Sequence, residues 1–284
     1  MKLVWFPAWL CQNYTFGQSF GAKCPYCPYS LSVQAGRLIY NNQETSSDGR
    51  AEASDLIGFF CGNYEAMERH LEVSGGEALM RKDVAFILAA IPHGWAMTSN
   101  TLHEPAIDAI ISTGAIKRCS SWTASWHPCS GQEERYARNI RTLANAGRKP
   151  RATVVVSQET VVRLPQTLEY LNSLPIEGVN WHLDTHRDPS LVPAIKESAD
   201  KVLGEGVAYL AGPAPRGRLC NRHDKLMAVS PDGTLYQCVT FAYQDKYPIT
   251  KVNAKTSLAK LPQRIEWCDE ECFACCDHIK HEKE

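Results

Sequence analysis

The alternation of short apolar runs with amphipathic stretches over the first 210 residues constrains the fold more than any other feature. Six apolar runs predict β-strands, at Leu3–Trp9, Leu71–Ser74, Trp95–Asn100, Ile116–Ser121, Thr153–Ser157 and Val179–Leu183. Amphipathic stretches predict helices between them, at Arg81–Ile91, Pro105–Ser112, Glu133–Ala146 and Leu164–Leu174. Apolar strands that alternate with helices indicate parallel βαβ units with the helices outside.

The length of the chain decides how many such units fit. Six units suit the first 212 residues, whereas a complete eight-unit barrel takes about 250 residues. We therefore expect an α/β protein with an open, partial (β/α)6 barrel over residues 1–212. A linker-like stretch begins at Gly212, and the turn Pro231-Asp232-Gly233 between two apolar runs predicts a β-hairpin. Residues 213–284 are expected to form a small, cysteine-rich C-terminal domain around that hairpin.

Twelve cysteines limit the possible chemistry and the compartment. A secreted disulfide scaffold is the simplest interpretation of so many cysteines. Such scaffolds are usually too short to build a hydrophobic core, whereas this chain is long enough to build one. Clustered cysteines in a long chain favour metal binding in a reducing, cytoplasmic setting. A hydrophobic content of 44% and a net charge of -1 are ordinary for a globular protein. No apolar stretch reaches the roughly 20 residues that span a bilayer, so we expect no membrane association.

Three cysteines near the N-terminus precede a glycine-rich strand end. Cys24-Pro25-Tyr26-Cys27 is a CxxC motif, and Cys11 supplies a third thiolate upstream. Three thiolates are one short of the usual four for a [4Fe–4S] cluster, which leaves one iron open. Ser74-Gly75-Gly76-Glu77 ends an apolar strand, where glycine permits close backbone approach and a carboxylate can meet an ammonium. An open iron beside an amine-binding strand end is what chelation of S-adenosylmethionine (SAM) requires.

These motifs resemble those of radical SAM enzymes, whose signature is CxxxCxΦC, with Φ aromatic, followed by GGE at the end of the second strand. Cys24-Pro25-Tyr26-Cys27 matches the second half of the signature, and Gly75-Gly76-Glu77 matches the GGE. The first gap holds twelve residues, Gln12 to Lys23, instead of three. We interpret it as an expanded cluster loop with Cys11 as the third ligand.

The resemblance implies an open six-unit barrel, a SAM-binding [4Fe–4S] cluster and an electron donor such as flavodoxin or ferredoxin. It also implies reductive cleavage of SAM to a 5′-deoxyadenosyl radical that abstracts a substrate hydrogen. Glu77 would hold the methionine ammonium, and Tyr26 would pack near the adenine.

Polar residues at the predicted ends of later strands are candidates for the rest of the site. Thr98-Ser99-Asn100 and Ser120-Ser121 are expected to end the third and fourth strands and to hydrogen-bond the ribose or the methionine carboxylate. Ordinary turn chemistry explains them equally well. Trp181, His182 and Asp184 on the sixth strand are expected to face the substrate, and no catalytic residue is assigned.

A second set of cysteines follows the hairpin. The spacing from Cys220 through Gly233 to Cys238 resembles the opening of SPASM and twitch extensions, which hold auxiliary iron–sulfur clusters in radical SAM enzymes. The shorter twitch type implies one more [4Fe–4S] cluster. Its implied ligands are Cys220, Cys238, Cys272 and Cys275, with Cys268 or Cys276 as possible replacements. A zinc site remains the alternative, because Cys268, Cys272, Cys275, His278 and His281 also have acceptable spacing.

Enzymes with such an extension, by resemblance, commonly oxidise or cross-link residues of peptides and proteins, and some oxidise small alcohols. We therefore expect an oxidoreductase that acts on an unactivated carbon of a peptide, a protein or a small molecule. Because the first predicted strand begins at Leu3, any peptide should be short or presented by a separate recognition protein.

Two other functions stay open. A nucleotide or nucleic-acid base is the alternative substrate, because basic residues gather in two places, although a solvated outer helix explains the first of them more simply. The groups are Arg135, Arg138, Arg141, Arg148, Lys149 and Arg151, and Arg216, Arg218, Arg222, His223 and Lys225. The non-enzymatic alternative is a cysteine-rich zinc or iron–sulfur binding module.

Overall fold

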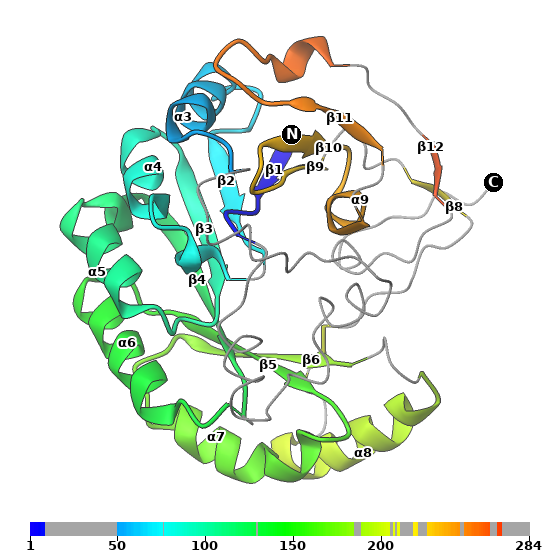
Figure 1. Cartoon of the computed structure of the whole chain (residues 1–284). Helices are drawn as coiled ribbons and strands as arrows, with labels where there is room; N and C mark the ends of the chain where they lie inside the picture. The colour runs from blue at the N-terminus through cyan, green and yellow to red at the C-terminus, as the bar shows by residue number, and fades with distance from the viewer. Residues whose placement is uncertain are drawn as a thin grey trace.

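The protein is described here by a computed structural model. The structure describes residues 1–8, 50–75, 77–128, 130–184, 189–204, 207, 209–210, 218–220, 226–244, 247–261 and 266–268. Within these residues the chain is an α/β protein with a mostly parallel, curved sheet that does not close on itself (Figure 1). The predicted open, partial barrel is confirmed.

Ten strands of the described chain form one sheet, in the order β11-β10-β9-β1-β2-β3-β4-β5-β6-β7. The strands from β9 and β1 through β7 pair in parallel, and β9, β10 and β11 pair in antiparallel. The strands are β1 Lys2–Trp5, β2 His70–Val73, β3 Gly94–Ser99, β4 Cys119–Trp126, β5 Arg151–Val156, β6 Gly178–Leu183, β7 Tyr209–Leu210, β9 Leu226–Val229, β10 Thr234–Tyr236 and β11 Pro248–Lys251.

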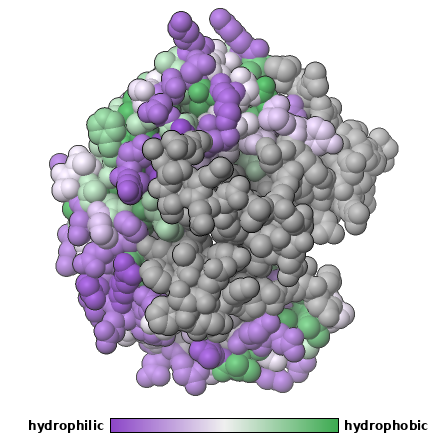
Figure 2. Space-filling model, viewed as in Figure 1, coloured by the Kyte–Doolittle hydropathy of each residue, from purple (hydrophilic) through white to green (hydrophobic). Residues whose placement is uncertain are grey.

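Helices cover the convex face of this sheet (Figure 1). They are α3 Ala53–Gly62, α4 Val84–Ala90, α5 Glu104–Ser112, α6 Glu133–Asn145, α7 Leu164–Asn172 and α8 Val192–Leu203, and α9 Val239–Gln244 follows β10. Short 3-10 turns lie at η2 Ala78–Met80, η3 Ala115–Arg118, η4 Val161–Arg163, η5 Pro189–Leu191 and η7 Leu258–Lys260. The outer surface of α6 and α7 is largely hydrophilic (Figure 2). No helix among the described residues is both long and apolar enough to cross a bilayer.

The two faces of the sheet differ because successive side chains of a strand point to opposite sides. On the helix side, Trp95, Trp122 and Trp181 belong to a buried apolar core together with residues of the helices. On the concave side, the row Ser125, Thr153 and Asn180 across β4, β5 and β6 is polar. At β1, β9 and β10 the same side carries a second buried apolar cluster, which includes Val4, Phe6, Leu226, Ala228 and Tyr236.

The predicted fourth strand, Ile116–Ser121, is wrong in its position. Residues Ala115–Arg118 form the 3-10 turn η3, in which Ala115 and Ile116 are buried, and the strand runs from Cys119 to Trp126. Two adjacent apolar residues bury equally well in a tight turn, whereas Trp122, Ala124 and Trp126 show the true alternation of a strand. Trp181 is a second correction, because it packs in the core on the helix side and does not face the concave side.

The predicted hairpin is present as β9 and β10, joined by the turn at Pro231-Asp232-Gly233. It does not stand apart from the barrel, because β9 pairs with β1 in parallel, with Leu3 opposite Met227. A separate two-stranded ladder joins β8, Arg218–Cys220, to β12, Glu266–Cys268. The domain boundary at residue 212 stays a prediction, although the strands after it extend the same sheet.

Candidate functional site at the carboxyl ends of β2 and β3

Glu77 lies just beyond β2 and is almost completely buried, with 1% of its surface exposed. Its Oε1 accepts hydrogen bonds from the Ser99 hydroxyl at 2.7 Å and from the Leu79 amide at 3.1 Å. Its Oε2 accepts one from the Asn100 amide at 2.7 Å. A carboxylate offers about four acceptor positions, so three donors leave room for one more.

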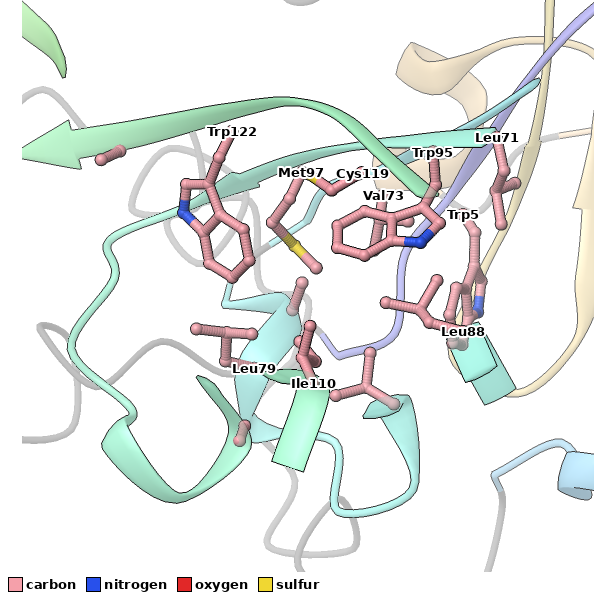
Figure 3. Close-up of a cluster of buried hydrophobic side chains, with 14 of the residues drawn as sticks. Trp5, Leu71, Val73, Leu79, Leu88, Trp95, Met97, Ile110, Cys119 and Trp122 are labelled. Carbon is pink, nitrogen blue, oxygen red and sulfur yellow. The ribbon is translucent and has the colours of Figure 1, made fainter. Parts of the chain in front are cut away.

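The turn after Glu77 is fixed by the core. Ala78 and Leu79 in η2 are fully buried, and Leu79 lies in the same apolar cluster as Ile110 and Trp122 (Figure 3). Because both residues after Glu77 are held in the core, the backbone at Glu77 is fixed, and the three hydrogen bonds fix the orientation of its carboxylate. The carboxylate is therefore held where the ends of β2 and β3 meet.

Gly75 brings this turn against the end of β1. It has a φ of +126°, which L side chains rarely adopt, and a Cβ at this position would lie 2.9 Å from the Ala8 carbonyl oxygen. The glycine therefore allows close approach to the chain's own segment after β1, which continues toward Cys11. Gly76 lies outside the described residues.

Burial governs the protonation of Glu77. Desolvation raises its pKa to about 6, and the hydrogen bonds from Ser99, Asn100 and Leu79 act in the opposite direction. The carboxyl is thus mostly ionised at neutral pH although no solvent surrounds it. A buried anion with a free acceptor position is chemically suited to a cationic donor such as an ammonium group.

Two of the polar residues predicted for the site, Ser99 and Asn100, do meet Glu77. The Ser99 hydroxyl donates its proton to the Glu77 carboxylate, and its oxygen accepts a hydrogen bond from the Thr101 amide at 2.8 Å. Ser99 therefore orients the Glu77 carboxylate. Asn100 contributes its amide to Glu77, and its Oδ1 accepts from the Leu102 amide at 3.0 Å.

Ser121 is a correction. It pairs with Ala96 near the start of β4, whereas Ser99 pairs with Ala124 farther along the strand. Ser121 is also exposed, and it lies toward the opposite end of the sheet from Glu77. The error follows from the misplaced fourth strand, because the residues at its true end are Trp126 and His127.

His127 is a candidate that the sequence prediction missed, and it directly follows β4. Desolvation lowers the pKa of His127 to about 4, so its imidazole is neutral at pH 7. On the sixth strand, His182 pairs with Val155 on the concave side, and buried Asp184 donates its amide to the Val156 carbonyl at 2.9 Å. The alternation of apolar residues at 122, 124 and 126 could have shown where β4 ends.

Most of the predicted cluster ligands lie outside the described residues: Cys11, Cys24, Cys27, Cys272, Cys275 and Cys276, as well as Tyr26. Cys238 is described and buried, and its sulfur accepts a hydrogen bond from the Phe241 amide at 3.4 Å. The β8–β12 ladder pairs Cys220 with Glu266 and Cys268 with Arg218. The strand that carries Cys268 therefore lies beside the strand that carries Cys220.

The first basic group does not form a uniform positive surface. Arg138 is paired with Glu104 at 3.2 Å. A shallow surface hollow of about 590 Å³ is lined by both Arg138 and Arg141 and by Glu133 and Glu134. The solvated outer helix remains the simpler interpretation of this group. Most of the second basic group lies outside the described residues.

No protein-family profile matches the chain, and no curated protein sequence matches it either. Solved structures do share its fold. The chain is similar to SuiB of Streptococcus suis bound to S-adenosylmethionine, with a TM-score of 0.56 and 11% identity over 90% of this chain and 62% of SuiB. It is also similar to anSMEcpe with bound AdoMet, with a TM-score of 0.59 and 14% identity over 91% of this chain and 79% of anSMEcpe.

Both of these proteins are radical SAM enzymes, and the chain has the fold of that class. SuiB has also been crystallised with its precursor peptide SuiA, and anSMEcpe with AdoMet and the Kp18Cys peptide. The chain spans about three fifths of the length of SuiB. At identities of 11–14% the similarity establishes the fold alone.

Proposed function

We propose that this protein is a radical SAM enzyme that modifies a peptide or protein side chain. The observation that carries the proposal is the buried, ionisable carboxylate of Glu77, held by three hydrogen bonds at the carboxyl ends of β2 and β3. Substrates and cofactors of barrels built from βα units bind at this edge. The fold shared with two AdoMet-bound proteins supports the same assignment.

The residues around Glu77 fit the amino-acid part of SAM. The free acceptor position on Glu77 suits the methionine ammonium, and Ser99 and the Asn100 amide hold the carboxylate in one orientation. Burial of the site strengthens that ion pair, because few water molecules compete for it. Together with a reduced [4Fe–4S] cluster, SAM supplies the 5′-deoxyadenosyl radical chemistry. The protein residues bind and orient SAM, and they exclude water from the site.

Cys11, Cys24 and Cys27 are the proposed ligands of the SAM-binding cluster, and Tyr26 is the proposed contact of the adenine. Gly75 supports this placement, because it packs against Ala8, three residues before Cys11. The described chain therefore reaches Ala8, three residues before Cys11 in the sequence, directly beside the turn that presents Glu77. Electrons would come from a donor of the flavodoxin or ferredoxin type.

A second cluster in the C-terminal region is part of the proposal. Cys220, Cys238, Cys272 and Cys275 are its proposed ligands. Because β12 pairs with β8, Cys268 is a better substitute ligand than Cys276, which has no comparable support from the described strands. Such a cluster can take up the electron that the substrate radical releases when it is oxidised.

A peptide is the favoured substrate. SuiB and anSMEcpe have both been crystallised with peptides. The concave side of this chain carries the polar row Ser125, Thr153 and Asn180, and the Thr153 hydroxyl is buried without a hydrogen-bond partner among the described residues. A peptide backbone supplies the donors and acceptors that such a surface needs. A nucleic-acid substrate is less well supported, since Arg138 is already paired with a carboxylate.

The proposal is tested by SAM cleavage. Anaerobically purified, reconstituted protein should release 5′-deoxyadenosine when it is reduced in the presence of SAM. Glu77→Gln should lose most of this activity, whereas Glu104→Gln, which alters a surface carboxylate paired with Arg138, should retain it. A protein that holds no iron after reconstitution, or that never cleaves SAM, would contradict the proposal.

Salt separates the two substrate classes. Nucleic-acid affinity falls with salt with a logarithmic slope of about -0.7 to -0.9 for each phosphate contact. We expect turnover of a peptide substrate to lack that dependence. Binding of an oligonucleotide with the steep slope, together with modification of its bases, would replace the peptide assignment.

A further inference from the structure

Thr101 has a backbone conformation that threonine rarely adopts. Its φ is +60°, in the left-handed region, and its side chain is completely buried. For a β-branched residue this conformation is an outlier. Such conformations persist only where the surroundings hold them, and they gather at functional sites. Thr101 lies two residues after Ser99, in the loop that supplies two of the donors to Glu77.

Two buried side chains from other elements hold Thr101 in place. The indole Nε1 of Trp122, on β4, donates to Thr101 Oγ1 at 3.1 Å. The Nδ2 of Asn139, on α6, donates to the Thr101 carbonyl oxygen at 2.8 Å. Both side chains are about 1% exposed, so water does not compete for these bonds. The loop is therefore fixed to the barrel from two sides.

Thr101 in turn determines how Ser99 and Asn100 meet Glu77. Its amide donates to Ser99 Oγ at 2.8 Å, and its hydroxyl donates to the Ser99 carbonyl at 3.3 Å. The Ser99 oxygen accepts this hydrogen bond from the Thr101 amide while its single proton is donated to Glu77 Oε1, so the amide helps to fix the position of the hydroxyl. The same turn of the backbone brings the Asn100 amide to Glu77 Oε2.

We infer that Thr101 is a positioning residue of the Glu77 site. It carries the constraint from Trp122 and Asn139 through Ser99 and Asn100 to the carboxylate. The left-handed turn is the geometry that aims a hydroxyl and an amide at the two oxygens of one side chain. The expected effect of Thr101 on SAM binding rests on the proposed function. The effect of Thr101 on the position of Glu77 does not, because it is a property of the protein without SAM.

Two neighbouring tryptophans provide a matched test. Trp95 and Trp122 are both buried, with ring centroids 6.2 Å apart at 64° (Figure 3). The Trp122 indole donates to Thr101, whereas the Trp95 indole nitrogen has no hydrogen-bond partner among the described residues. Trp122→Phe and Trp95→Phe therefore remove similar apolar bulk, and only Trp122→Phe removes a hydrogen bond to Thr101.

The first measurement is amide hydrogen exchange of residues 99–102 in the protein without SAM. The second is the Kd of SAM for the reconstituted protein. We expect Trp122→Phe to speed exchange in this segment and to raise the Kd about tenfold, the change that corresponds to one lost hydrogen bond. Trp95→Phe should change each by less than about twofold. Equal effects of the two variants on both measurements would overturn the inference.

Thr101→Val gives an independent test if Trp122→Phe fails to fold. It keeps the shape of the side chain and removes the hydroxyl from the same hydrogen bond. In a double-mutant cycle, Trp122→Phe should add little to Thr101→Val, whereas Trp95→Phe should act independently. Full additivity of Trp122→Phe and Thr101→Val would contradict the inference. If the wild-type protein bound no SAM, the proposed function would fail, and hydrogen exchange would still decide the role of Thr101.

Discussion

The Arg81 guanidinium donates a hydrogen bond to the Pro231 carbonyl oxygen at 3.3 Å, across 150 residues of sequence. Arg81 is 1% exposed, and it also bonds the Ala51 carbonyl at 2.8 Å and both carboxylate oxygens of Asp83. The same guanidinium lies 5.7 Å from the ring centroid of Trp5. One side chain thus ties the segment after Glu77 to the start of α3 and to the C-terminal hairpin.

Replacing Arg81 by Met should destabilise the protein by about 3 kcal/mol, because the half-buried carboxylate of Asp83 and the carbonyl oxygens of Ala51 and Pro231 lose their donor. Urea unfolding measures this loss. The control is Arg138→Met, since Arg138 is 59% exposed and forms a surface ion pair, which is worth at most about 1 kcal/mol. Equal losses in the two variants would show that Arg81 is not the tie between these segments.

SAM binding should weaken in mild acid. Glu77 must be ionised to bind an ammonium, and its pKa in the free protein is raised to about 6. Below that pH, a proton competes with the ammonium, and the Kd of SAM should rise by up to about tenfold for each pH unit. Isothermal titration between about pH 5 and pH 8 measures this. Glu77→Gln should bind weakly at every pH, and a wild-type Kd that is independent of pH would argue against Glu77 as the ammonium ligand.

Acid should also destabilise the fold through His93, which precedes β3. Its side chain is fully buried against the ring of Tyr64, and neither ring nitrogen has a hydrogen-bond partner among the described residues. Desolvation, with a smaller effect of His70, lowers the pKa of His93 to about 4. The unfolded chain therefore binds this proton first, and stability present above about pH 6.5 is lost as the pH falls toward 4.

That loss amounts to about 3 kcal/mol, since each pKa unit corresponds to 1.36 kcal/mol. Urea unfolding at about pH 7 and pH 4.5 should show it. His93→Phe fills the same space without a titrating group, so the stability of this variant should fall less over the same range. An identical loss in both proteins would assign the acid sensitivity to other groups, such as His127.

The cluster count distinguishes the iron–sulfur and zinc interpretations of the C-terminal cysteines. Two cysteine-bound [4Fe–4S] clusters hold about eight irons per chain. Replacing Cys11, Cys24 and Cys27 by Ala should leave about half of that iron. Metal analysis of the anaerobically reconstituted protein measures both values. About four irons with one zinc in the intact protein would favour the zinc site.

The sequence predicted local elements well where apolar periodicity was unambiguous. β2, β3, β5 and β6 lie within one or two residues of their predicted ranges, because each is a short apolar run that ends in a polar turn. β4 was misplaced because Ile116 buries its side chain in a turn, and a run of Ser and Thr hid the start of the strand. The sequence placed Ser99 and Asn100 at the carboxyl end of the third strand, but it did not predict that both would hydrogen-bond Glu77.

Other features could not be predicted because they depend on contacts between distant parts of the chain. The left-handed conformation of Thr101 is accompanied by hydrogen bonds from Trp122 and Asn139, which lie 21 and 38 residues away in the sequence. The sequence predicted Arg81 as the first residue of a helix and gave no sign that its side chain is buried, with Asp83 as its ion-pair partner. The pairing of β9 with β1 joins residues more than 200 positions apart. Hydrophobic periodicity can predict that each segment is a strand, but it does not show which strands pair.

That pairing has a consequence for how the chain is made. β1 is synthesised before the other strands of this sheet, but one of its two edges has no strand partner until residues 226–229 have been synthesised. Until β9 has been synthesised, β1 therefore exposes a row of free amides and carbonyls that another chain could pair with. A fragment that stops at residue 212 would keep this edge open permanently. We expect such a fragment to aggregate, and the C-terminal hairpin to act as an intramolecular chaperone for the N-terminal strand.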